Sequence, residues 1–269
     1  MAITDILRPY ALKWLYNRSP ASEGTLEEYI SIVKNSNNMP YFAPLSIGST
    51  DGLCDTDSDA LFTQLPEYKK LLKKFPIPEA DSEPTDFGKA RAVIDWISKN
   101  TYYNGMQKKW MPDDTLWLLN WSAGQGFEHA INCRHKAIIY TDLLLARGMK
   151  AYPILLNSGE AERGSCHFVT HVYCREHGWI VMDPSFGSWF TDSSGHIMNV
   201  YELRDTFLSG EKPAVHNYSF NGTGECMDVY LNEFIEVTLT NISTWTTNAL
   251  VRGIKDRSEV EFKAKVPKN

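Results

Sequence analysis

The chain has 269 residues, of which 43% are hydrophobic and eight are tryptophan, so it can bury the core of one large domain or two small ones. This composition argues against a disordered chain. The net charge of −6 argues against a nucleic-acid-binding protein, which would carry a basic face. No stretch approaches the roughly 18 uncharged apolar residues of a membrane helix, so neither nucleic acid nor a membrane is expected as a partner.

The N-terminal segment and the cysteines bear on the compartment. Charged residues interrupt "MAITDILRPYALKWLYNRS", so it lacks the apolar region of a signal peptide. The cysteines are odd in number and scattered through a large chain, unlike the disulfide framework of a small secreted domain. They are Cys54, Cys133, Cys166, Cys174 and Cys226. We therefore expect a cytoplasmic protein whose thiols are mostly reduced.

Three regions are expected along the chain. Residues 1–82 form a helical N-terminal extension that ends in a linker rich in proline and acidic residues, "FPIPEADSEPT". Residues 83–215 form the core domain, and residues 216–269 form a C-terminal segment packed on that core. The core begins with an amphipathic helix in "TDFGKARAVIDWISKN", because Ala90, Val93, Ile94 and Ile97 fall on one helical stripe.

A second helix is expected from Cys133 to Arg147. Asn132 is its predicted N-cap, because an asparagine side chain can accept an N–H of the first turn. Gly148 is its predicted C′ residue, because glycine takes the left-handed conformation without strain. Cys133 would then lie at a helix N-terminus, where the partial positive charge favours a thiolate.

A β-hairpin is predicted for "HVYCR" and "WIVMD", joined by "EHG" with Gly178 in the left-handed position. Closing the loop on Arg175 and Trp179 places His171 opposite Asp183, with Cβ atoms about 5 Å apart. A nucleophilic cysteine needs a base in hydrogen-bonding reach and a third group that orients the base. Cys133, His171 and Asp183 are therefore the predicted nucleophile, base and orienting carboxylate.

These residues allow other interpretations. A zinc site could use Cys166, His167 and His171, although strand alternation puts Cys174 on the opposite face and no CxxC pair is present. A serine nucleophile at Ser185 is disfavoured, because "DPSFG" lacks the G-x-S-x-G elbow. We expect no metal and no cofactor. A protein that keeps the fold as a binding scaffold, without catalysis, is the non-enzymatic alternative.

The segment from about residue 86 to 187 resembles the transglutaminase-like branch of the papain-like cysteine enzymes. The resemblance is carried by Cys133 opening a helix that runs into "LLLARGMKAYPI", by "THVY" and by "GWIVMDPS". It implies an α+β fold, in which a helix bearing Cys133 packs on an antiparallel sheet bearing His171 and Asp183. It also implies attack on a carbonyl to form an acyl-thioester, which is then passed to water or an amine.

The expected activity is cysteine-dependent cleavage or transfer at an amide, peptide or isopeptide bond. Hydrolysis is preferred to transamidation, because no calcium-loop signature is present. The substrate is expected to be a protein or peptide, or a small amide. The Cys133 N–H is the first expected oxyanion donor. Gln125 or Trp121 is the second, and Tyr173 stands where many relatives carry tryptophan and is a candidate substrate-binding residue.

Overall fold

The computed structural model describes residues 66–105, 107, 111–112, 114–157, 166–224, 227, 230–235, 238–239 and 241–244. The described part of the predicted N-terminal extension consists of two short helices, α4 (Pro66–Lys74) and α5 (Pro78–Ser82). The remainder of that extension, residues 1–65, lies outside the described residues, as do Cys54 and Cys226.

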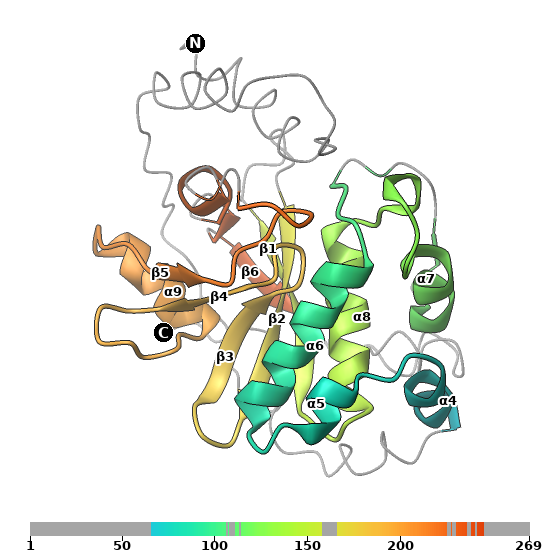
Figure 1. Cartoon of the computed structure of the whole chain (residues 1–269). Helices are drawn as coiled ribbons and strands as arrows, with labels where there is room; N and C mark the ends of the chain where they lie inside the picture. The colour runs from blue at the N-terminus through green and yellow to red at the C-terminus, as the bar shows by residue number, and fades with distance from the viewer. Residues whose placement is uncertain are drawn as a thin grey trace.

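An antiparallel sheet forms the centre of the fold, and among the described residues it has six strands in the order β5-β4-β3-β2-β1-β6 (Figure 1). Each neighbouring pair is antiparallel. The strands are β1 (Ala151–Asn157), β2 (Cys166–Cys174), β3 (Gly178–Asp183), β4 (Ser188–Thr191), β5 (Ala214–His216) and β6 (Asn241–Thr244). Because β6 pairs with β1, the C-terminal segment contributes to the sheet itself.

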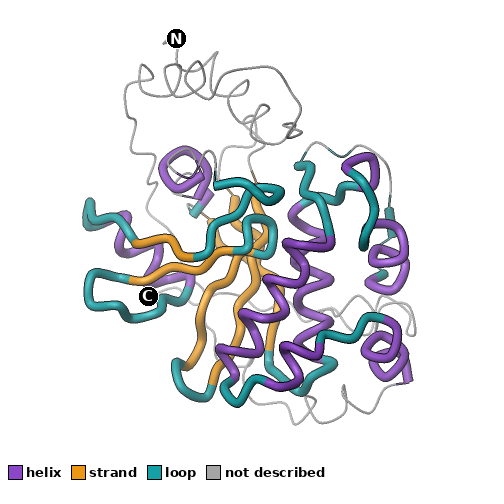
Figure 2. The backbone as a smooth tube through the Cα atoms, in the orientation of Figure 1, coloured by secondary structure: helices purple, strands orange, loops and turns teal. Residues whose placement is uncertain are grey.

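Helices pack on both sides of this sheet (Figure 2). On one side lie α4, α5, α6 (Asp86–Asn100), α7 (Thr115–Ser122) and α8 (Cys133–Leu145). The short 3-10 helix η1 (Phe127–His129) precedes α8. On the other side lie α9 (Val200–Leu208) and the π-helix η2 (Tyr230–Ile235). This arrangement confirms the predicted α+β fold.

The sheet separates two apolar cores. The core on the α4–α8 side contains four hairpin residues that were predicted to point inward: Val172, Cys174, Ile180 and Met182. The core on the α9 side contains residues of α9 and η2 together with Val181, and it also includes Cys133. The alternation along the hairpin was therefore predicted correctly, since odd and even positions face different cores.

Local signals fix both ends of α8. The side chain of Asn132 accepts a hydrogen bond from the His135 N–H at 3.1 Å, which makes it the N-cap as predicted. Gly148 has a φ of 75°, and its N–H donates to the Leu145 carbonyl. The helix therefore begins at Cys133 and ends in a left-handed glycine turn.

The register predicted for the β2–β3 hairpin is wrong by two residues. Tyr173 pairs with Trp179 and His171 with Val181, so Asp183 lies opposite Val169 rather than His171 when the register is continued. Gly178 does adopt the left-handed conformation, with a φ of 72°. The shift is even, so every side chain keeps its predicted face while its cross-strand partner changes.

The N-terminus of α6 explains why the three-residue loop of the hairpin lies at 175–177 instead of the predicted 176–178. The Asp86 carboxylate accepts hydrogen bonds from the Arg175 backbone N–H at 3.1 Å and from the Arg175 guanidinium at 2.7 and 2.9 Å. The adjacent Glu176 carboxylate accepts a bond from the Phe87 N–H at 2.6 Å. Arg175 is therefore bonded to a helix instead of pairing with Trp179, and it belongs to the loop.

Candidate active site

Cys133 is the first residue of α8 and is 8% exposed. At this position the first turn of a helix presents N–H groups that no helical carbonyl can accept, and the helix dipole adds partial positive charge. Both features favour negative charge on an oxygen bound beside the Cys133 Sγ.

His167, near the start of β2, and Asp183, at the end of β3, form the buried polar pair of the site. The His167 Nε2 lies 2.6 Å from the Asp183 Oδ2, and both side chains are fully buried. The two residues are diagonal neighbours on one face of the sheet, because Asp183 lies opposite Val169 in the observed register. The other oxygen of the carboxylate, Oδ1, accepts the Ser185 N–H at 2.8 Å, which fixes the plane of the carboxylate.

The Cys133 side chain lies close enough to the His167 imidazole to act on its charge. Burial disfavours its protonated form, but the charge and hydrogen bond of Asp183, together with the influence of Cys133, outweigh burial and raise the pKa of His167 to about 9. With this pKa, His167 is mostly protonated at neutral pH. The structure brings Cys133, His167 and Asp183 together.

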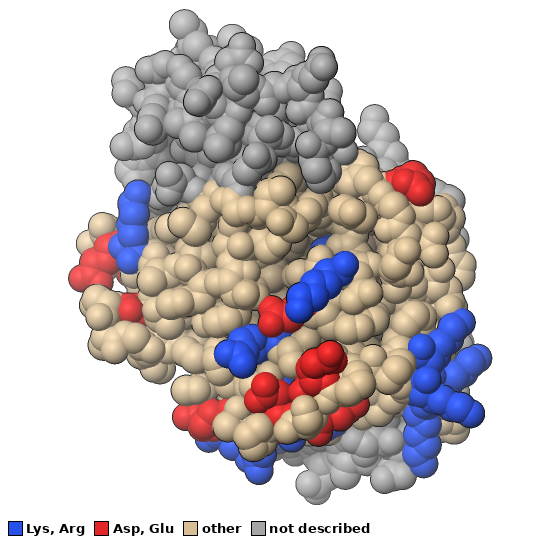
Figure 3. Space-filling view, in the orientation of Figure 1, with Lys and Arg blue, Asp and Glu red and all other residues tan. Residues whose placement is uncertain are grey.

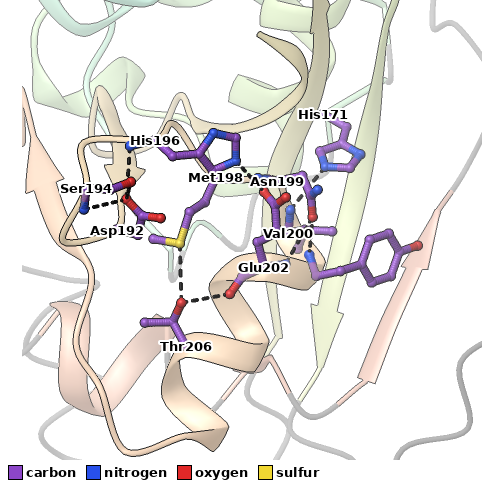
Figure 4. A network of polar contacts seen from close by, with 10 residues as sticks. His171, Asp192, Ser194, His196, Met198, Asn199, Val200, Glu202 and Thr206 are labelled. Atoms are coloured by element: carbon purple, nitrogen blue, oxygen red, sulfur yellow. Dashed lines mark hydrogen bonds and ion pairs between the residues drawn. The ribbon is translucent and has the colours of Figure 1, made fainter.

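His171 is not part of this cluster, contrary to the prediction. Its Nε2 accepts the Val200 N–H at 3.1 Å (Figure 4). Its Nδ1 lies 2.8 Å from the Tyr152 hydroxyl. The Val200 N–H belongs to the first residue of α9, so His171 satisfies a helix N-terminus from outside that helix. Burial lowers the pKa of His171 to about 3, which keeps the ring neutral.

Strand geometry separates the two histidines. They lie on one face of β2 but four residues apart, which corresponds to about 13 Å along a strand. A base must come within hydrogen-bond reach of the thiol, so the two rings cannot serve the same cysteine. The sequence contained the correct signal, since His167 also lies on the strand face of Asp183, but the predicted register selected the wrong member of the pair.

The three residues predicted as oxyanion donors or substrate contacts lie in different surroundings. Trp121, half-buried in α7, stacks on Trp117 with ring centroids 5.8 Å apart and lies 4.2 Å from the His129 ring. Gln125 is exposed in the turn after α7. Tyr173 is 37% exposed near the hairpin end of β2, six residues from His167 and therefore about 20 Å along the strand. Their roles stay predictions, and the distance weighs against Tyr173.

Two buried residues next to the site were not predicted. Tyr230 is the first residue of η2, and its hydroxyl donates to the Asp183 Oδ2 at 2.9 Å. Lys136, one turn after Cys133 on α8, donates from its Nζ to the Thr101 carbonyl at 3.0 Å. Burial lowers the pKa of Lys136 to about 7, although the nearby Asp183 charge opposes this change. Only the spacing of Lys136 from Cys133 on a helix could have indicated such proximity.

The zinc alternative does not fit these contacts. His167 is bonded to Asp183, while His171 is bonded to Tyr152 and to the N-terminus of α9. Within the described ranges, no group of three or more His, Cys, Asp or Glu side chains could hold a metal ion. The Cys166–His167–His171 set is therefore replaced by two separate histidine environments.

The surface charge is local rather than continuous on the face drawn in Figure 3. Basic side chains gather over α4, whose exposed lysines are Lys69, Lys70, Lys73 and Lys74. Acidic and basic side chains are mixed over the region below the centre of the same view. Of the helices that the structure describes, none has both the length and the apolar character needed to cross a membrane.

Cys133, His167 and Asp183 follow one another in the Cys–His–Asp order expected from the sequence, with the cysteine at a helix N-terminus. Residues 77–184 match the family described as the transglutaminase-like superfamily. This matched segment covers less than half of the chain, contains Cys133, His167 and Asp183, and is similar to that superfamily. Comparisons with curated proteins and with solved structures found no match.

Proposed function

We propose that the protein is a cysteine-dependent acyl hydrolase or acyl transferase, with Cys133 as nucleophile, His167 as general acid and base, and Asp183 as the carboxylate that orients His167. The contact of His167 with both Cys133 and Asp183 carries this proposal. The assignment replaces His171 with His167 and leaves the predicted chemistry unchanged.

In the proposed reaction, the Cys133 Sγ attacks the carbonyl carbon of an amide, peptide or isopeptide bond. Asp183 holds the Nε2 of His167, so Nδ1 is the nitrogen that takes the thiol proton. That proton then passes to the leaving amine as the C–N bond breaks. Water or a second amine next attacks the thioester, His167 removes a proton from this nucleophile, and the Cys133 thiolate leaves.

The oxyanion of each tetrahedral intermediate would lie at the N-terminus of α8. There the Cys133 backbone N–H points toward developing negative charge, and the helix dipole supports it. We propose a protein, peptide or small amide as substrate, with hydrolysis preferred to transamidation.

Acylation by an activated ester tests this function without a known substrate. We expect p-nitrophenyl acetate to acetylate Cys133 once per chain, with release of nitrophenolate, and we expect the thioester to be discharged by water or by an added amine. Peptide mass spectrometry locates the acetyl group. Cys133→Ser should abolish the rapid acetylation.

Cys174→Ser is the matched control. Cys174 is a buried thiol in the other core, and burial raises its pKa to about 12, so its loss should leave acetylation unchanged. Equal acetylation of Cys133 and the exposed Cys166 would contradict the proposed function, because it would mean that Cys133 is not selectively activated.

A further inference from the structure

Asp183 Oδ2 receives hydrogen bonds from two side chains. One comes from the His167 Nε2 at 2.6 Å, and the other from the Tyr230 hydroxyl at 2.9 Å. The Tyr230 oxygen also lies 2.9 Å from the Ser188 Oγ. A chain of contacts therefore runs from Ser188 through Tyr230 and Asp183 to His167, and all four residues are buried.

The Tyr230 ring is fixed by other aromatic rings. Its centroid lies 4.4 Å from that of Phe186, 5.1 Å from that of Tyr218 and 6.2 Å from that of Phe190. Burial and the Asp183 charge raise the pKa of Tyr230 well above its ordinary value. The phenol therefore stays protonated, and it can only donate to the carboxylate while its oxygen accepts from Ser188.

We propose that Tyr230 is a positioning residue of the catalytic site: its hydroxyl shares Asp183 with His167 and sets how strongly the carboxylate holds the imidazolium. This inference rests on the proposed function, in which His167 is the catalytic base. It also gives η2 and β4 a role in positioning the site, although both lie beyond the matched residues 77–184.

The direction of the effect follows from the shared oxygen. A donor on Oδ2 disperses part of the negative charge that attracts His167, so Tyr230 weakens the attraction while it fixes the carboxylate in place. Without the hydroxyl, Asp183 should hold the imidazolium more strongly and the pKa of His167 should rise. The carboxylate would also have more freedom to rotate, which lowers the rate of acyl transfer.

The other titratable groups near His167 and Asp183 are Cys133 and Lys136, both on α8. Tyr218 lies near Tyr230 and helps to raise its pKa. Tyr218 provides a matched control. It belongs to the same aromatic cluster as Tyr230 and carries the same hydroxyl, but its ring contacts Phe186 and Tyr230. Tyr218→Phe therefore removes an equivalent atom from this cluster without removing the Tyr230–Asp183 contact.

The test is an NMR titration of the histidine imidazoles in the full chain, made for the wild type, Tyr230→Phe and Tyr218→Phe. The chain has seven histidines, so the His167 signal is assigned by its absence in His167→Gln. We expect Tyr230→Phe to raise the His167 titration midpoint by roughly half a pH unit or more, and to slow acetylation of Cys133 several-fold. Tyr218→Phe should match the wild type in both measurements.

An unchanged His167 midpoint in Tyr230→Phe, or an equal shift in Tyr218→Phe, overturns the inference. The NMR measurement does not depend on the reactivity of Cys133. Failure of the wild type to form an acetyl-enzyme would count against the proposed function, whereas an unshifted midpoint with normal acetylation would count against Tyr230 alone. Thermal unfolding of each variant identifies any loss of fold.

Discussion

Replacing each of the two β2 histidines by glutamine separates a catalytic role from a structural one. His167→Gln and His171→Gln remove the same group from the same strand face, four residues apart. We expect only His167→Gln to change how the reactivity of Cys133 depends on pH, because only His167 contacts Cys133 and Asp183.

The magnitude follows from protonation. His167 has a pKa of about 9, so an imidazolium is available to pair with the thiolate throughout pH 5 to 8. The wild-type alkylation rate should therefore change little over this range. An ordinary thiol has a pKa of about 8.5, so its thiolate fraction falls roughly a thousandfold between pH 8 and pH 5. The alkylation rate of Cys133 in His167→Gln should fall by about the same factor between pH 8 and pH 5.

The assay is alkylation with iodoacetamide followed by peptide mass spectrometry. The exposed Cys166 is the internal reference for a thiol that is not activated, because burial and the Cys133 charge raise its pKa. His171→Gln should keep the flat wild-type profile of Cys133. A steep profile in His171→Gln together with a flat one in His167→Gln would refute the reasoning. So would a wild-type Cys133 that follows Cys166 at every pH.

Three further predictions concern stability, each measured by urea unfolding against pH. The pKa of His171 is about 3 in the folded state and near 6.5 in the unfolded state. Between these values the unfolded state binds more protons, so the free energy of unfolding should fall as pH drops from 6.5 to 3. It should fall less in His171→Gln. The pKa of His167 is raised to about 9, so this residue should contribute roughly 3 kcal/mol to the free energy of unfolding below pH 6.5. That contribution should be lost as pH rises to 9, and it should be absent in His167→Gln. Lys136 has its pKa lowered to about 7, so in a His167→Gln background stability should rise from pH 7 toward 10.5, and Lys136→Met should remove that rise. Parallel curves for a variant and its parent would contradict the corresponding assignment.

The features predicted correctly from the sequence depend on neighbouring residues. Asn132 caps α8 by bonding an N–H three residues away. Gly148 and Gly178 take left-handed conformations that few other residues adopt without strain. These signals were enough to place Cys133 at a helix N-terminus and to assign each hairpin side chain to the correct face.

The register could not be predicted, because a distant contact decides it. Arg175 could pair in the hairpin or lie in the loop, and Asp86 at the N-terminus of α6 selects the loop. This difference of two residues moves the partner of Asp183 and changes which histidine meets the carboxylate. Tyr230 had no signal at all, because its contact with Asp183 spans 47 positions and arises only when η2 packs on the sheet.

The pairing of β4 with β3 and of β6 with β1 determines how short a fragment of this protein can be made. A piece that stops at residue 184 would retain Cys133, His167 and Asp183, but β1 and β3 would each lose a neighbour. Both would then present open backbone donors and acceptors along their length, which is the usual starting point for strand-to-strand association between molecules. The segment shared with the superfamily is therefore shorter than the unit expected to stay monomeric when expressed alone.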